Sequence, residues 1–105
     1  MLSELQDKLF GELERVGFIL PDGEVVEVKN VCEDPRNGFQ VDAADLLDYA
    51  LVAVATWHTH PNASKVLTVE DYTGFLNYPD LDHYIIGTDG VAKYVVKDGD
   101  VLIDE

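Results

Sequence analysis

A nearly continuous apolar run, ALVAVATW at residues 50–57, ends in two histidines, His58 and His60. A run of this length, rich in valine and alanine, predicts a buried strand. Alternate residues of a strand project to the same face, so His58 and His60 point together, with Thr56 behind them. Both faces are apolar up to the histidines, which favours a central strand covered on both sides.

The remaining periodicities predict further elements around this strand. Apolar residues at helical spacing, and a capping-box pair of Ser3 and Gln6, predict a first helix that ends at Gly11. Helices are also expected at 42–50 and 68–76, with Asp42 and Thr68 as N-caps. Strands are expected at 16–20, 24–30, 39–41, 83–88, 91–97 and 101–103. This order predicts an α/β fold with a single mixed β-sheet flanked by helices.

Length and composition narrow the class of protein. A chain of 105 residues is close to the usual size of one domain, so residues 1–105 are expected to form a single unit. No segment approaches the ~20 continuous apolar residues that a membrane span requires, so membrane insertion is not expected. The N-terminal sequence lacks the basic start and long apolar stretch of a secretory signal. We therefore expect cytoplasmic synthesis without a signal peptide.

Charge and cysteine content restrict the partners and the metal chemistry. The chain carries 21 acidic and 7 basic residues, for a net charge of −14. This field repels phosphate, so nucleic acid is not an expected partner, whereas solubility or a basic partner would both suit it. Cys32 is the only cysteine, which excludes an intrachain disulfide and a zinc site built from several thiolates. Nitrogen and oxygen ligands are expected for any metal.

The histidine pair is itself a candidate metal site, because two neutral imidazole nitrogens can share one cation. The alternative is two partly exposed histidines at a strand end. A catalytic zinc needs three protein ligands and a water. Asp71, in the first turn of the helix that begins at Thr68, is the candidate third ligand. It could instead only complete a capping box with Thr68, and we expect the two roles to exclude each other.

The segment HTHPNASKVLTVED resembles the signature of the JAMM (MPN+) metalloprotease family, which is His-x-His-Pro, six residues, Ser, two residues, Asp. The spacing agrees throughout, with Thr68 in place of the serine. The family also has a glutamate in a Glu-x-x-Gly setting at the start of a strand, and ERVG supplies it. The positions that match are Glu14, Gly17, His58, His60, Pro61 and Asp71.

The resemblance implies a JAMM/MPN-type, cytidine-deaminase-like fold and a zinc-dependent metallopeptidase that hydrolyses a peptide or isopeptide bond. Zn²⁺ would be held by His58, His60 and Asp71, with a water as fourth ligand. Glu14 would act as general base, and Thr68 would donate a hydrogen bond to the oxyanion. The extra methyl group of Thr68 could tilt that donor. Iron(II) oxygenases are less consistent with the helices, and zinc deaminases need a Cys-x-x-Cys pair.

The compact size resembles bacterial and phage versions of the family, including domains of phage tail assembly proteins. This implies a cell-wall stem peptide or a small ubiquitin-like protein tail as substrate, phage tail proteins as partners, and a location in the virion. The alternative is a non-catalytic structural or assembly module of a phage tail that retains the metal site.

Overall fold

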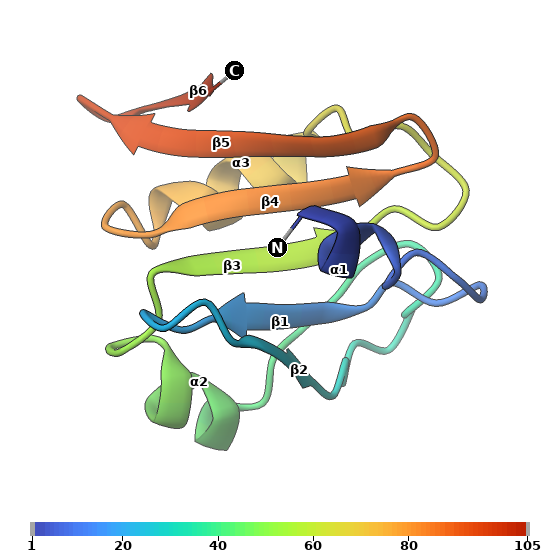
Figure 1. The fold of residues 1–105 in the computed structure, drawn as a ribbon, viewed down its shortest axis with the longest axis horizontal. Helices are drawn as coiled ribbons and strands as arrows, with labels where there is room; N and C mark the ends of the chain where they lie inside the picture. The colour runs from blue at the N-terminus through green and yellow to red at the C-terminus, as the bar shows by residue number, and fades with distance from the viewer. Residues whose placement is uncertain (1, 105) are drawn as a thin grey trace.

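A computed structural model describes residues 2–104, and the six strands in this part of the chain form one sheet (Figure 1). β3 and β4 are parallel, and the other neighbouring strands are antiparallel, so the sheet is mixed. Across the sheet the order is β2 (Val25–Val28), β1 (Val16–Ile19), β3 (Ala55–Thr59), β4 (Asp82–Gly87), β5 (Gly90–Lys97) and β6 (Asp100–Ile103).

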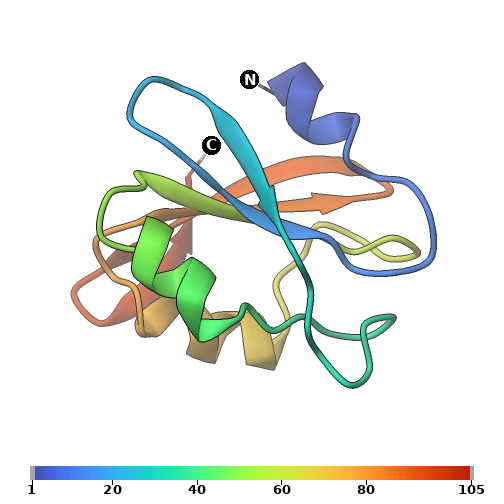
Figure 2. The same cartoon turned by 90° about the horizontal axis from the view of Figure 1, so that it is seen from below.

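Helices cover both faces of this sheet (Figure 2). Helix α1 (Leu2–Gln6) lies on one face, whereas α2 (Ala43–Tyr49) and α3 (Val69–Leu76) lie on the other. Between α1 and the sheet lies a cluster of buried apolar side chains that includes Trp57. The opposite face carries two separate apolar clusters, one beside α2 and one below α3. The prediction of a mixed α/β sheet flanked by helices is therefore confirmed.

The histidine-bearing strand is central, as predicted, but it is shorter than predicted. It begins at Ala55, not at residue 50, and lies between β1 and β4. Helix α2 continues to Tyr49, and the amides of Val52 and Ala53 then donate to the carbonyl of Tyr49 in a turn. Leu51 is 92% exposed as a result. The apolar residues 50–54 suggested a strand, but in the structure they form the turn that connects α2 to β3.

Other predicted boundaries also change. Helix α1 ends at Gln6, and Ser3 lies within it instead of capping it, so the predicted helix 3–11 is too long. Residues 39–41 form only one isolated bridge, between Val41 and Asn30. Asp42 is at the N-cap position of α2, but its side chain makes no capping hydrogen bond. In residues 2–104, no helix has both the length and the apolarity to cross a membrane.

Gly17 in β1 is required by its cross-strand neighbour. Gly17 is paired with Trp57 of β3, and the Trp57 indole Nε1 donates to the Val26 carbonyl on β2 at 3.1 Å. The indole therefore crosses β1 above Gly17. A Cβ atom at residue 17 would lie 2.6 Å from Trp57 Nε1, closer than packed atoms can approach. The glycine fixes how β1 lies against β3, and this alignment positions Glu14.

Gly17→Ala is therefore expected to lower the free energy of unfolding by about 1–3 kcal/mol, because the methyl group displaces the indole or the neighbouring backbone. Urea denaturation measures the change. Gly74→Ala is the matched control, since a methyl group at that helical position meets no atom within 4 Å. Equal unfolding free energies for Gly17→Ala and the wild type would contradict this account.

Candidate metal centre

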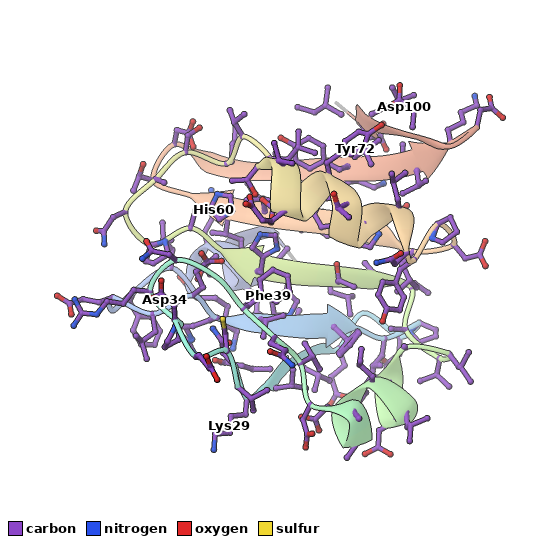
Figure 3. All side chains as sticks on the ribbon, turned by 180° about the vertical axis from the view of Figure 1, so that it is seen from behind. Lys29, Asp34, Phe39, His60, Tyr72 and Asp100 are labelled. Carbon is purple, nitrogen blue, oxygen red and sulfur yellow. The ribbon has the colours of Figure 1, made fainter. Side chains whose placement is uncertain are left out.

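The end of β3 brings the two predicted histidines together. His58 and His60 are 1% and 7% exposed, and their Nε2 atoms lie 3.2 Å apart. In Figure 3, His60 lies beside the N-terminal end of α3. The alternative of two partly exposed histidines at a strand end does not hold, because both rings are buried.

Asp71 reaches the same point from the first turn of α3. Its Oδ1 lies 3.0 Å from His58 Nε2, and its Oδ2 lies 3.1 Å from His60 Nε2. Ligand atoms held tetrahedrally at ~2.0–2.2 Å from zinc lie roughly 3.3–3.6 Å apart. The three side chains are therefore close to the spacing that a tetrahedral metal requires, and small adjustments would complete it.

Capping does not turn the Asp71 carboxylate away from the histidines, although we expected capping and metal ligation to conflict at this residue. Asp71 Oδ2 accepts a hydrogen bond from the Thr68 amide at 3.0 Å, and Thr68 Oγ1 accepts one from the Asp71 amide at 3.1 Å. This is a complete capping box, and it confirms Thr68 as the N-cap of α3. The box uses Oδ2 and leaves Oδ1 directed at His58. Capping thus orients the carboxylate towards the two histidines.

A backbone carbonyl fixes the tautomer of His60. His60 Nδ1 lies 2.7 Å from the Ser64 carbonyl oxygen, which can only accept, so Nδ1 carries a proton. A neutral His60 ring would then have at Nε2 the lone pair that a metal requires, whereas in the structure Nε2 lies 3.1 Å from Asp71 Oδ2. The loop that holds Ser64 packs directly on Gly87 at the end of β4, where a Cβ atom would lie 2.8 Å from the Ala63 oxygen. Asp89 also accepts from the Ser64 hydroxyl at 2.7 Å.

Burial and hydrogen bonds shift the pKa values of the three side chains in different directions. Burial raises the pKa of Asp71, but hydrogen bonds from His58 and His60 outweigh burial and hold that pKa well below its usual range. Burial lowers the pKa of His58, which favours the neutral ring. Burial also acts to lower the pKa of His60, but its contacts with Asp71 and Ser64 raise it overall. A metal binds an ionised carboxylate and neutral imidazoles, so a bound cation would displace the Nε2 proton that these contacts favour on His60.

Glu14 lies at the edge of this cluster, two residues before β1. Its amide donates to the Pro35 carbonyl at 2.7 Å, and its own carbonyl accepts from Asn30 Nδ2 at 2.8 Å. One ligand atom each of Glu14, His58 and His60 lie within 4.8 Å of one another. Glu14 is thus an alternative third ligand, but Asp71 is closer to both imidazoles. Burial raises the pKa of Glu14 to about 7.

Thr68 completes the group of predicted residues at the same cleft. Its hydroxyl oxygen accepts from the Asp71 amide, which leaves the hydroxyl proton free to be donated. The residue is exposed at the cleft surface. The structure thus brings all five predicted site residues to one cleft of about 860 Å³ between α3 on one side and α2 with the loop before it on the other.

The cleft also contains residues that the sequence did not indicate. The Phe39 ring lies 4.5 Å from the His58 ring, centroid to centroid, and projects over β3 in Figure 3. His83 is not in the cluster. Its ring stacks on Phe75, its Nδ1 is 2.6 Å from the Thr56 hydroxyl, and its Nε2 donates to the Tyr78 carbonyl. The contacts of Phe39 with His58 and of Thr56 with His83 join segments 19 and 27 residues apart, so no local sequence signal could reveal them.

Comparisons with known proteins support the fold alone. No family model and no curated protein matches the sequence. Protein DSY2949 from Desulfitobacterium hafniense, whose structure was determined in solution, is similar in fold, with a TM-score of 0.68 and 21% sequence identity. The similarity covers 100% of this chain and 83% of that protein. The fold and cluster together define a small mixed α/β domain with a candidate metal centre of two histidines and an acid.

Proposed function

We propose that this chain is a zinc-dependent metallopeptidase of the JAMM (MPN+) type that hydrolyses a peptide or isopeptide bond. The observation that carries the proposal is the convergence of His58, His60 and Asp71 in one cleft, with Glu14 beside them. These residues have the spacing of the family signature. The mixed sheet, with ligands supplied from β3 and the first turn of α3, also supports a JAMM/MPN-type fold.

The donor set fits zinc. Two imidazole nitrogens and one carboxylate are a common set of protein ligands for catalytic zinc, in which a fourth position stays open for water. Bound there, zinc supplies a Lewis acid that polarises the scissile carbonyl and lowers the pKa of the water. The hydrogen bond from His60 Nδ1 to the Ser64 carbonyl fixes the orientation of the His60 ring, so that Nε2 would face the metal. The capping box orients Asp71 in the same way.

The other two residues handle the proton and the developing charge. The pKa of Glu14, raised by burial to about 7, suits a group that must first accept a proton and then deliver it to the leaving amine. Its backbone is held at both its amide and its carbonyl, which limits movement of this base. Thr68 would donate its free hydroxyl proton to the oxyanion. A cell-wall stem peptide and a ubiquitin-like tail both contain the required carbonyl, and phage tail proteins remain the proposed partners.

Protein purified without added metal is expected to contain one zinc per chain, as measured by elemental analysis. His58→Ala and His60→Ala should each lose most of it, since either change removes one of three ligands. Cys32→Ser is the control, because this cysteine lines the same cleft but is not proposed as a ligand, and it should keep the zinc. Iron in place of zinc, or no metal even after zinc is supplied, would refute the assignment.

A further inference from the structure

The cleft continues beyond the candidate metal centre along β3. Thr56 precedes His58 on the same face, and the sheet register places Phe18 of β1 and His83 of β4 beside it. Two residues along a strand span about 6.6–6.8 Å. Thr56 and its cross-strand neighbours Phe18 and His83 therefore lie about 6.6–6.8 Å along the sheet from His58.

This part of the cleft is apolar, and we call it the apolar arm. Its lining residues are Phe18, Leu46, Thr56, Phe75 and Tyr78. The Thr56 hydroxyl is already bonded to His83, and the His83 Nε2 proton is used by the Tyr78 carbonyl. The polar groups at the floor are thus satisfied within the protein. A ligand in the arm gains from burying apolar surface and finds few polar side chains to pair with.

Gly74 keeps one wall of the arm open. Gly74 lies inside α3 and lines the cleft, and a Cβ atom there would meet nothing within 4 Å. Its φ is not positive, so the backbone does not require glycine. Glycine in a helix interior is less favourable than alanine. Because Gly74 has no side chain, it leaves space in the cleft that any larger residue at position 74 would enter.

The direction of the arm determines which part of a substrate would occupy it. On β1, Val16 pairs with His58, and Phe18 lies two residues further along the strand, towards the arm. Glu14 lies two residues before Val16, in the other direction along the chain. The Arg15 carbonyl accepts from the Thr59 amide, so the alignment of the two strands continues towards Glu14. The amine that leaves with the proton of Glu14 must be on the Glu14 side. The acyl part of the substrate then lies over β3 towards the arm.

From this geometry we infer that the apolar arm binds a large apolar side chain, aromatic or long aliphatic, on the residue that supplies the scissile carbonyl. Gly74 is the specificity-determining residue, because it leaves room for that side chain. The inference rests on the proposed peptidase function and narrows its substrate class to peptides cleaved after large apolar residues.

The test is cleavage of a mixed peptide library by the zinc-loaded protein, with cleaved bonds identified by mass spectrometry. Wild-type protein should cleave after Phe, Tyr, Leu or Met at least about tenfold faster than after Gly or Ala, as expected for burial of one large side chain. Gly74→Phe should reduce this preference at least tenfold. Thr73→Phe, which places the same ring on the exposed side of α3, should leave the preference unchanged. Gly74→Leu repeats the test with a side chain that suits a helix better.

A binding measurement tests the inference independently of catalytic activity. N-acetyl-phenylalaninamide should bind the wild type about tenfold or more tightly than N-acetylglycinamide in an NMR titration, and Gly74→Phe should remove the difference. Equal binding of the two probes, or cleavage without preference, overturns the inference while leaving the peptidase proposal intact. If the zinc-loaded wild type cleaves no bond in the library, the proposed function fails, and the inference fails with it.

Discussion

Glu14→Gln is expected to lower the rate of peptide hydrolysis by a factor of about 10²–10⁴ while leaving zinc content and folding intact. The amide has nearly the shape of the carboxylate but cannot accept the proton of the attacking water. The melting temperature should not fall, because the change removes a buried acid whose charged form is disfavoured by burial. Hydrolysis of a quenched fluorescent peptide, together with zinc analysis, measures both parts.

Glu12→Gln is the matched control, since Glu12 also lines the cleft but is exposed and pairs with Arg36 at 3.0 Å. It should keep most of the activity. Loss of zinc from Glu14→Gln would make Glu14 a ligand, as its position within 4.8 Å of both imidazole nitrogens allows. Full activity would mean that the base lies elsewhere. Zinc binding without hydrolysis in the wild type would favour the non-catalytic assembly module instead.

Asp71→Asn is expected to weaken zinc binding by more than about 100-fold, because the substitution removes the only anionic ligand. The asparagine oxygen can still accept the Thr68 amide, so the cap should be nearly preserved. Wild-type protein holding zinc at 100 times its Kd should lose about 2.7 kcal/mol of stability when a chelator is added. The variant, which does not hold the metal, should not respond to the chelator. Zinc titration and thermal unfolding, each with and without chelator, give the result.

Thr68→Ala separates capping from ligation in the same experiment. It removes the hydroxyl that caps α3 and should cost about 1 kcal/mol of stability, but it leaves the three ligands in place. Its melting temperature should therefore still fall on chelation. If Asp71→Asn binds zinc as tightly as the wild type does, Asp71 is only a capping residue and another third ligand must be found.

Features set by neighbouring residues were predictable from the sequence. Two-residue turns at Thr88–Asp89 and Asp98–Gly99 join the last three strands. Thr68 caps α3 as its spacing from Asp71 indicated. Residues 50–54 were misassigned because apolarity does not distinguish a buried strand from the exposed turn that follows a helix. Leu51 is apolar and yet 92% exposed.

Only part of the site could be predicted from the sequence. The spacing from His58 to Asp71 lies within one strand–loop–helix unit, so the family signature captures it. The approach of Glu14 depends instead on how β1 aligns with β3, 40 residues and more along the chain, and on contacts with Asn30 and Pro35. The Glu-x-x-Gly pattern identified Glu14, but it did not indicate these contacts. That the capping carboxylate also faces both histidines was not predicted from the sequence, because the two Asp71 oxygens were treated as one group.

The shared carboxylate also has a kinetic consequence. The first turn of α3 can fray only if the bonds between Thr68 and Asp71 break, and fraying would withdraw Asp71 from both histidines. Local opening of the helix end and escape of a bound ion would then be coupled events. A bound ion would slow fraying, and an intact first turn would slow ion loss. The residence time of the ion would therefore depend on the dynamics of a single helical turn as well as on the strength of the metal–ligand bonds.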